Sequence, residues 1–496
     1  MTRATSTLLL GLPCLLLLSP ACGGDDQTDG NDEIGNDSSS SESADAVDEV
    51  DESASSSADT SADTTATTTA ESSSTDTETT ADTADTVDSV DTSSDTADTT
   101  ATTATTDSTT GDGDGDTTTG GDPCNGMGGG NNFEFSYLWA SNSPQGTVSK
   151  IDTQAAVEVA RYASGPNGAT DPSRTSVSSD GKFAVVVNRN GGITMIAAED
   201  ADCDDANDNG MIDTSQGPND VRPWGQDECV LWNVPLPANG TNGPRPVSWT
   251  IGEQDPITCQ YAAGDVWVGW YDQGQNTGYF RLLEGMTGNT LDDVQVPGWS
   301  GQTWGPYGGA IDSENNFWAI GWGQTGPVVK IDAVTHEATH YGSAGGWIYG
   351  MGLDLEGNTW AGGCGNGNVY RFHKANETWS TVLNVPGVSC LRGLQVDFDG
   401  VAWIAKNGPC GLAAIDTSVE PPQPIDLDIP IAGCSTPVGV SIDAEGFVWV
   451  VDQGANRAFK IDPDTYQVVG QVTGLVSPYT YSDMTGAGIA GQVNPQ

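Results

Sequence analysis

The sequence predicts an all-β protein, a seven-bladed β-propeller with four-stranded antiparallel blades, preceded by a disordered acidic linker. After about residue 132, two apolar positions of the sequence each recur seven times. In both series the intervals are 41 to 51 residues, apart from one longer gap. Apolar and polar residues alternate between turn residues, which is typical of antiparallel strands. One series is Trp139, Trp267, Trp318, Trp360, Trp403 and Trp449, with Ala184 in the second unit, and the other is Ile151, Ile196, Leu282, Ile331, Phe372, Ile415 and Ile461.

Each predicted blade follows one order of strands and turns, and the last copy shows it most clearly. An inner strand over 436–443 contains a glycine and ends at an aspartate, a turn at Gly446 leads to a strand around Trp449, and a third strand ends at Lys460-Ile461-Asp462. One such unit cannot bury both of its faces, so neighbouring units must stack. We therefore expect the repeated tryptophans to pack between blades rather than to bind a ligand.

The two ends of the repeat region predict how the ring closes. The first unit begins at Phe133 and lacks an innermost strand, whereas residues 478–483 form an extra strand-like segment after the seventh unit. We expect this segment to return and complete the first blade, because closure removes exposed strand edges. The propeller is thus expected over residues 132–490, with an insertion at 199–229.

Residues 1–22 resemble the signal peptide of a bacterial lipoprotein. Arg3 supplies the positive start, a leucine-rich stretch over 8–18 supplies the apolar core, and Ser19-Pro20-Ala21-Cys22 is similar to a lipobox. The resemblance implies lipidation of Cys22 and an exported protein of the cell envelope, held on the outer membrane and exposed on its periplasmic or outer surface. Ordinary cleavage followed by secretion is the alternative.

Residues 23–131 are predicted to be a disordered linker. No Lys or Arg occurs between Arg3 and Lys150, and Asp, Ser, Thr and Ala dominate the segment. Such a composition offers too little apolar surface to offset chain entropy. The formal charge of the whole chain is −53, which disfavours DNA, RNA and anionic lipids as partners. We expect no nucleic-acid partner, membrane contact through the lipid anchor only, and a monomeric head.

The repeat also resembles a known family. The pattern Pro437-x-Gly439, Asp443, Gly446-x-x-Trp449 and Lys460-Ile461-Asp462-Pro463 is similar to the repeat of virginiamycin B lyase and, more loosely, of NHL and gluconolactonase-type propellers. The resemblance covers about residues 133 to 487. It implies a divalent-metal-dependent lyase or lactonase in which a His and a Glu act near a magnesium ion.

The histidines of this chain do not carry that chemistry over. His336 and His340 are expected between the third and fourth strands of the fourth blade, and His373 just past the third strand of the fifth. None is expected on an inner strand, where groups face the propeller channel. We therefore assign no catalytic residue, and the family's activity is kept as the alternative function.

The insertion of the second blade contains a calcium-loop pattern. Asp-x-Asn-x-Asn-Gly-x-Ile-Asp over 205–213 places oxygen ligands at alternating positions and a glycine at the turn, which suits a hard cation. The twelfth position is Gln216 instead of Glu, so Asp220 or another nearby acid would have to substitute. The predicted calcium ligands are Asp205, Asn207, Asn209, the Met211 carbonyl and Asp213.

Cysteine usage predicts an oxidising compartment. Cys203 and Cys229 flank the calcium-like loop and are expected to pair. Two further disulfides are expected on one face of the propeller, formed by the loops between second and third strands and between blades, with three pairings open. Cys124 and Cys259 are a speculative pair. The four cysteines of that face are Cys364, Cys390, Cys410 and Cys434.

The same face is the predicted binding surface. Aromatic and arginine side chains near a channel mouth can hold a sugar, a peptide or a carboxylate, although plain channel lining is the other interpretation. We therefore favour a surface-anchored, non-enzymatic propeller that binds or scaffolds a protein or carbohydrate ligand. The candidate binding residues on the inner strands are Arg174, Tyr307, Tyr349, Arg392 and Tyr479.

Overall fold

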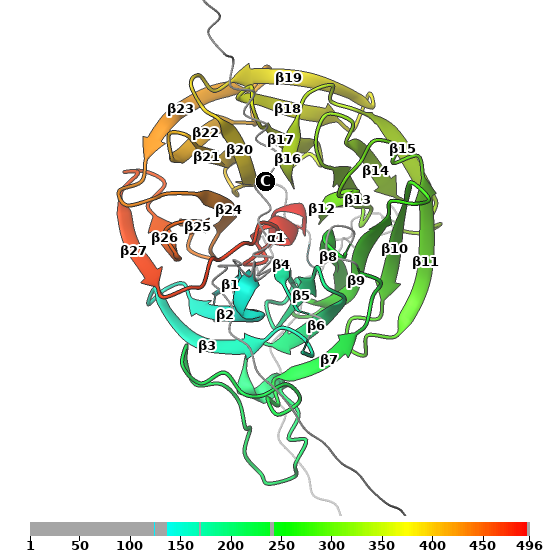
Figure 1. The fold of residues 1–496 in the computed structure, drawn as a ribbon, viewed down its shortest axis with the longest axis vertical. Coiled ribbons are helices and arrows are strands. Elements are labelled where there is room, and N and C mark those ends of the chain that lie inside the picture. The colour runs from blue at the N-terminus through cyan, green and yellow to red at the C-terminus, as the bar shows by residue number, and fades with distance from the viewer. Residues whose placement is uncertain (1–123, 125–135, 168–169, 239–242, 494–496) are drawn as a thin grey trace, which may run out of the picture. The chain divides into compact units, whose positions relative to one another are not determined.

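The computed structural model describes residues 124 and 136–493, with gaps at 168–169 and 239–242. The predicted signal peptide, Cys22 and nearly all of the predicted linker lie outside the described residues. Seven antiparallel sheets form a ring (Figure 1), six of them four-stranded, so the predicted seven-bladed propeller is confirmed. Among the described residues no helix is long and apolar enough to span a membrane.

The strands of the first three blades follow the chain in order, and the first strand of each sheet lies on the inside of the ring (Figure 1). Blade 1 contains β1 (Tyr137–Asn142), β2 (Thr147–Asp152) and β3 (Val157–Ala163); blade 2 contains β4 (Pro172–Val177), β5 (Phe183–Asn188), β6 (Gly192–Ala197) and β7 (Val230–Val234); blade 3 contains β8 (Val247–Gln254), β9 (Tyr261–Asp272), β10 (Thr277–Leu283) and β11 (Thr290–Pro297).

The next four blades repeat the same order without a long insertion. Blade 4 contains β12 (Pro306–Ile311), β13 (Phe317–Gly321), β14 (Pro327–Ile331) and β15 (Ala338–Ser343); blade 5 contains β16 (Ile348–Leu353), β17 (Thr359–Gly363), β18 (Asn368–His373) and β19 (Thr378–Asn384); blade 6 contains β20 (Cys390–Val396), β21 (Val401–Asn407), β22 (Gly411–Asp416) and β23 (Gln423–Pro430); blade 7 contains β24 (Pro437–Ile442), β25 (Val448–Asp452), β26 (Arg457–Ile461) and β27 (Val468–Thr473).

A buried hydrogen bond fixes the turn between the first two strands in four blades. The aspartate that ends the inner strand accepts a bond from the indole Nε1 of the tryptophan six residues later. The glycine of this turn has φ near 80° in blades 5, 6 and 7, a conformation that side chains disfavour. The repeated tryptophans are no more than 3% exposed, which confirms their predicted packing role. The bonded pairs are Trp318–Asp312 at 2.8 Å, Trp360–Asp354 at 2.8 Å, Trp403–Asp397 at 2.7 Å and Trp449–Asp443 at 2.9 Å.

The chain's tail closes the ring as predicted. Residues 478–483 lie beside β1, where the Tyr479 amide donates to the Ser141 carbonyl at 2.9 Å and the Trp139 amide donates to the Met484 carbonyl at 3.0 Å. The only ladder contact between the two segments is an isolated bridge from Asn142 to Pro478. The first blade therefore takes its innermost segment from the other end of the chain.

A helix that the sequence analysis did not predict follows this segment. It is α1 (Ala487–Val493), which lies near the centre of the ring (Figure 1). The Asp483 carboxylate accepts hydrogen bonds from the Gly488 and Ile489 amides, both at 2.9 Å. At the other end of α1, the buried Gln492 amide donates to the Asp354 carbonyl at 2.8 Å. The helix is thus tied to the ends of the inner strands.

The ring has two faces, which we name by what they carry. The mouth face holds the loops between second and third strands and the connections between blades. The tether face holds the loops between first and second and between third and fourth strands. Cys259 lies in the β8–β9 loop of the tether face and is bonded to Cys124, a residue near the end of the predicted linker.

All four disulfides follow the predicted groupings. Cys203–Cys229 and Cys124–Cys259 are formed, and the open pairing on the mouth face resolves as Cys364–Cys390 and Cys410–Cys434. Each of the latter two joins the hairpin between the second and third strands of one blade to the start of the next blade's inner strand. Four disulfides are typical of an exported protein.

Candidate binding site at the mouth face

The five predicted binding residues come together at the centre of the ring. Arg174 lies on β4, Tyr307 on β12, Tyr349 on β16 and Arg392 on β20, while Tyr479 lies on the returning tail. The Tyr479 hydroxyl is 2.9 Å from that of Tyr307 and is also hydrogen-bonded to that of Tyr349. Each of the five is at most 3% exposed. They therefore fill the channel instead of forming an open surface, and their role in ligand binding stays a prediction.

Three further residues belong to this group and were missed by the sequence analysis. Tyr481, from the tail, accepts a hydrogen bond from the Arg174 guanidinium, whose carbon lies 3.6 Å from the Tyr481 ring centroid. Arg189 lies 5.3 Å from the Tyr479 ring and donates to Asp171 at 2.5 Å. The complete set, here called the channel cluster, is Arg174, Arg189, Arg245, Arg392, Tyr307, Tyr349, Tyr479 and Tyr481.

The channel cluster concentrates positive charge in a strongly acidic protein. Four of the sixteen basic residues of the chain lie here, each with its guanidinium carbon within 6 Å of a tyrosine ring centroid. Such cation–π contacts stabilise by about 0.5–2 kcal/mol each. Guanidinium groups do not lose their proton in proteins, so they are poor candidates for general bases. The cluster suits rigid packing and anion recognition better than proton transfer.

Three tryptophans from mouth-face loops pack above this cluster, and none belongs to the repeated series. Trp304 precedes β12, Trp322 lies between β13 and β14, and Trp347 precedes β16. The Trp322 ring contacts Trp347 edge-on with centroids 4.8 Å apart and Trp304 with centroids 6.3 Å apart. All three are partly exposed, and Trp304 and Trp322 pack on the buried tyrosines. We call these three residues the tryptophan platform.

Polar atoms accompany the tryptophan platform. The Arg245 guanidinium carbon lies 4.8 Å from the Trp304 ring centroid. Gln302 donates to the Thr325 hydroxyl at 2.7 Å, but its Oε1 and the Trp322 Nε1 are buried without a hydrogen-bond partner among the described residues. Buried polar atoms normally have a partner, which is often a water or a ligand. The platform therefore offers partly exposed aromatic surface, and one donor and one acceptor are buried beside it.

The calcium-like loop of the insertion is folded on itself. The Asp205 carboxylate accepts hydrogen bonds from the Asn209 and Gly210 amides, at 3.1 and 2.8 Å. The side-chain nitrogens of Asn207 and Asn209 donate to Asp213 Oδ2 at 3.0 and 2.9 Å. These bonds, led by the one from Asn207, hold the pKa of Asp213 below its usual value. Four of the five predicted ligands are thus brought together, and the fifth, Met211, donates its amide to Asn209 Oδ1 at 2.8 Å.

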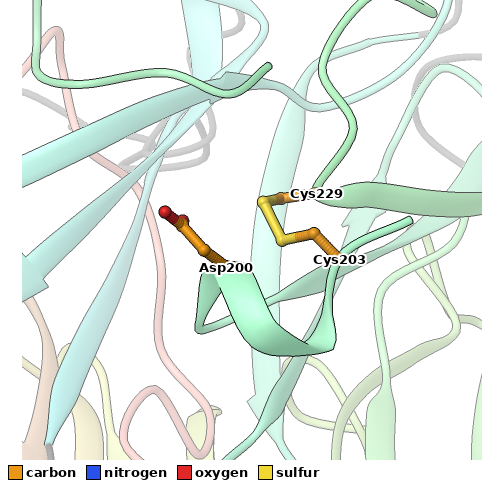
Figure 2. Close-up of side chains that lie close together, drawn as sticks. All are labelled: Asp200, Cys203 and Cys229. Atoms are coloured by element: carbon orange, nitrogen blue, oxygen red, sulfur yellow. A yellow bond between two sulfur atoms is a disulfide. The ribbon is translucent and has the colours of Figure 1, made fainter. Parts of the chain in front are cut away.

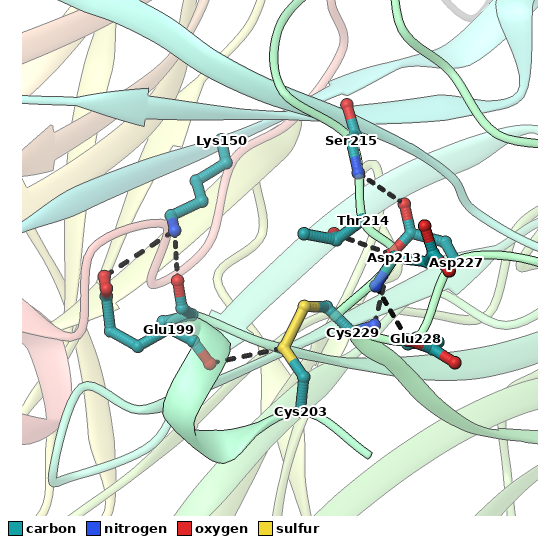
Figure 3. Close-up of a disulfide and its surroundings, with 10 residues drawn as sticks. Lys150, Glu199, Cys203, Asp213, Thr214, Ser215, Asp227, Glu228 and Cys229 are labelled. Carbon is teal, nitrogen blue, oxygen red and sulfur yellow. Dashed lines mark hydrogen bonds and ion pairs between the residues drawn. A yellow bond between two sulfur atoms is a disulfide. The ribbon is translucent and has the colours of Figure 1, made fainter. Parts of the chain in front are cut away.

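Glu228 is the acid that reaches the loop from outside. Its carboxylate accepts from the Asp213 amide at 2.7 Å (Figure 3). It also accepts from the Asn207 amide at 3.2 Å. Asp220, which the sequence analysis offered as a substitute ligand, accepts from the Gln216 amide instead. The Cys203–Cys229 disulfide places Glu228 beside the loop, fifteen residues beyond Asp213 in the sequence.

Asp227 anchors the base of the insertion. Its carboxylate accepts from the Thr214 hydroxyl at 2.8 Å, the Ser215 amide at 3.0 Å and the Cys229 amide at 3.1 Å (Figure 3). Burial raises the pKa of Asp227. Ser215 in turn accepts from the Arg161 amide on β3 at 3.0 Å, so the insertion of blade 2 is packed against blade 1.

One group of three potential metal ligands occurs among the described residues, and it lies at the same insertion. It consists of Asp200, Cys203 and Cys229. The two sulfur atoms are bonded to each other (Figure 2), so they cannot act as thiolates. The group therefore provides one carboxylate and no metal site.

The histidines lie on the outer parts of their blades. His336 is in the β14–β15 loop, with its Nδ1 2.7 Å from an Asp292 carboxylate oxygen. His340 lies within β15, so its predicted position between strands is wrong by a few residues. His373 is the last residue of β18 rather than just past it, and its Nε2 is 2.8 Å from the Ser380 hydroxyl. The expectation that no histidine occupies an inner strand is confirmed.

Comparison with known protein families finds no match, and comparison with curated proteins finds none either. Among solved structures, the chain is similar to a streptogramin B lyase, with TM-score 0.36 and 16% identity over 47% of this chain and 69% of that one. It is also similar to virginiamycin B lyase from Staphylococcus aureus, with TM-score 0.43 and 13% identity over 63% and 89%. For apo AztD from Citrobacter koseri the TM-score is 0.42 and the identity 12%, over 70% and 96%. These likenesses concern the propeller fold alone.

Proposed function

We propose that this chain is a non-enzymatic binding module that holds a protein or carbohydrate ligand on its mouth face. The tryptophan platform carries this proposal, because three partly exposed tryptophan rings lie together on the mouth face. Partly exposed aromatic residues over a packed base are typical anchors of binding sites. The covalent attachment at Cys124 lies on the opposite, tether face, which leaves the mouth face turned away from the attachment point.

The lyase or lactonase alternative requires acidic groups and a metal converging in the channel. The inner strands instead supply arginines and tyrosines there. The three histidines, which the resemblance would use for proton transfer, are on outer strands and loops. We therefore favour binding over catalysis.

Ligand binding can be tested with the full chain on a glycan array and on the outer-membrane protein fraction. The variant carries Trp304→Ala and Trp347→Ala together, and Trp379→Ala is the matched control. Trp379 is also partly exposed, but it lies on the outermost strand of blade 5 and donates to the Gly342 carbonyl. We expect the double variant to lose at least about tenfold in affinity, or about 1.4 kcal/mol, while the control binds as the wild type does. Equal binding by both variants would refute the proposal.

We also propose that calcium orders the insertion. Asp205, Asn207, Asn209, Asp213 and the Met211 carbonyl supply oxygen ligands of the kind calcium takes, and Glu228 supplies the carboxylate that position 12 lacks. The lowered pKa of Asp213 favours its ionised form. The role we assign is structural, because the insertion lies away from the channel and packs on β3.

Calorimetric titration of the full chain with calcium tests this second proposal. The wild type is expected to release binding heat that Asp205→Ala and Glu228→Gln both reduce. Asp220→Ala is the control, since Asp220 lies in the same insertion but bonds Gln216. If Asp220→Ala removes the heat and Glu228→Gln does not, the ligand set is wrong, and absence of heat in the wild type ends the proposal.

The position of the protein in the cell is proposed from the sequence. Lipidation of Cys22 would hold the head on the outer membrane through the linker of residues 23–131. Acyl labelling of the wild type and of Cys22→Ala checks this. Labelled wild type and unlabelled variant are expected, and a variant that still fractionates with membranes would contradict the anchor.

A further inference from the structure

A second concave site lies on the mouth face, at the boundary between blades 2 and 3. It is a cavity of about 710 Å³ between the segment that leaves blade 2 and the β9–β10 hairpin. Pro237 lines one side, Asp272 and Gln273 of the hairpin turn line the other, and Trp270 and Tyr279 lie between them. Its volume falls within the usual range for small-molecule sites, roughly 300–1,000 Å³. None of these residues belongs to the tryptophan platform or the channel cluster.

Two stacked aromatic rings form a wall of this cavity. Trp270 on β9 and Tyr279 on β10 are directly opposite in the strand register, and their rings are nearly parallel, with 8° between the planes and 5.7 Å between centroids. Trp270 is only 8% exposed. On its other flank the Arg281 guanidinium carbon lies 5.5 Å from the Trp270 ring centroid, and Asp293 holds this guanidinium by bonds of 2.7 and 2.9 Å. The wall is therefore fixed before any ligand arrives.

Polar groups surround the aromatic wall, and their charge restricts the ligand. Asp272 contributes a carboxylate that accepts from the Gln275 amide and side chain at 3.2 and 2.6 Å. Tyr279 donates its hydroxyl to Gln275 at 3.4 Å, and Gln273 is an exposed amide. The lining residues include a carboxylate and no lysine or arginine. In a chain of net charge −53, an anionic ligand would be repelled here.

We propose that this cavity binds a neutral carbohydrate through one or two of its sugar rings. The apolar C–H face of a pyranose ring can pack against the partly exposed Tyr279 ring, while its hydroxyl groups can both donate to Asp272 and pair with the Gln273 amide. A pre-ordered aromatic surface limits the entropy lost on binding. A cationic ligand is less suited, because the Arg281 guanidinium already lies 5.5 Å from the Trp270 ring centroid.

Titration of the full chain with soluble oligosaccharides tests the site. The probes are cello-, chito- and malto-oligosaccharides of about six units, with hexalysine as the cationic peptide and hexaglutamate as the anionic one. At least one sugar is expected to bind, and Tyr279→Ala and Gln273→Ala should each weaken that binding about tenfold, the equivalent of 1.4 kcal/mol. Gln273 is exposed, so its replacement leaves the fold intact even if removal of Tyr279 disturbs packing.

The controls separate this site from the tryptophan platform. Tyr341→Ala is the matched control, because Tyr341 also stacks on a tryptophan, Trp318, with centroids 6.2 Å apart, but does not line the cavity. Tyr341→Ala and the platform variant Trp304→Ala should leave sugar binding unchanged. Sugar binding that Trp304→Ala abolishes and the cavity variants do not would assign it to the platform and overturn this proposal alone. Binding of hexalysine only, or of no sugar, would also overturn it.

Discussion

The two faces of the propeller differ in how much of their chemistry serves the fold. The tether face carries α1, the Asp–Trp turns and the Cys124–Cys259 bond, all of which connect structural parts to one another. The mouth face carries two disulfides that join neighbouring blades, but also the tryptophan platform and the cavity beside Trp270. The two sites proposed here for ligand binding both lie on the mouth face.

Ring closure on the tether face gives the largest expected effect. A chain that ends at Leu475 loses the segment bonded to Ser141 and Trp139, and with it α1 and two tyrosines of the channel cluster. Blade 1 would then expose a strand edge, which promotes association. We expect loss of a cooperative thermal transition and a shift to aggregates in size-exclusion chromatography. A chain that ends at Val493 is the control and should behave as the wild type; equal behaviour of both truncations would contradict the closure.

Two aspartates of the tether face should differ in their contribution to stability. Asp443 accepts from Trp449 and also pairs with the buried Lys460 at 3.1 Å. Asp397 accepts from Trp403, and no cation is paired with it among the described residues. We expect Asp443→Ala to lower the free energy of unfolding by about 3–5 kcal/mol, because the buried Lys460 ammonium loses the carboxylate with which it is paired. Asp397→Ala should cost about 1–3 kcal/mol for the unpaired indole.

Urea denaturation of both variants measures this difference. Lys460 keeps bonds to Glu445 and to the Thr153 carbonyl, so the combination Asp443→Ala with Lys460→Met reports how much of the loss comes from the stranded charge. The combination should recover part of the lost stability. Equal losses in the two single variants would show that the lysine pair adds nothing to the repeated Asp–Trp bond.

The repeat made the fold and the ring closure predictable from sequence. Trp449 and its counterparts recur because every blade must bury the same position. The extra segment at 478–483 supplies the innermost strand that blade 1 lacks. The same periodicity gives no information about α1, whose glycine- and alanine-rich sequence has neither helical periodicity nor sufficient length. The helix forms because the folded chain places the Asp483 carboxylate where it accepts hydrogen bonds from the first amides of α1.

The candidate sites were predictable only in part. Tyr307 and Tyr349 occupy the same repeat position, so their meeting in the channel follows from the fold, but their burial does not, because it depends on Tyr481 of the tail. Trp304, Trp322 and Trp347 lie in loops outside the repeat register. Glu228 is distant from the calcium-like loop in sequence, and only the neighbouring disulfide brings it there.

The disulfides on the two faces should differ in whether they stabilise the whole propeller or only one loop. Cys410–Cys434 and Cys203–Cys229 close loops of similar length, with separations of 24 and 26 residues, which corresponds to about 3 kcal/mol of unfolded-state restriction for either. The Cys410–Cys434 loop includes β22 and β23, so its double serine variant should lower the global unfolding temperature. The Cys203–Cys229 loop is the insertion, so its double serine variant should unfold locally.

Limited proteolysis alongside calorimetry separates these two outcomes. The variant with Cys203→Ser and Cys229→Ser should be cleaved within residues 199–229 while the main thermal transition moves little. The variant with Cys410→Ser and Cys434→Ser should show the reverse. A large fall in the global transition for the insertion variant would mean that its packing on Arg161 and β3 supports the whole ring.

The smallest expected effect concerns pH and the cap of α1. Asp483 is partly buried, and desolvation raises its pKa from 3.8 to about 6 despite the two amide bonds it accepts. Because the folded-state pKa lies above the unfolded one, the stabilisation is fully present below about pH 4 and is lost as the pH rises through 6. The ionised carboxylate is therefore tolerated at neutral pH at a cost of at most about 3 kcal/mol.

Asp483→Asn removes this titration and keeps a side chain of similar shape. Other carboxyl groups also titrate between pH 4 and 7, so the quantity to follow is the difference in unfolding free energy between the wild type and the variant. The wild type should become more stable relative to the variant as the pH falls from 7 to 4. Asp462→Asn is the control, since Asp462 is a partly exposed turn residue whose pKa is lowered by the Thr465 amide. The difference between the wild type and Asp462→Asn should move in the opposite direction. A flat difference for Asp483→Asn would mean that water reaches the cap, and that the tether-face end of the channel is open.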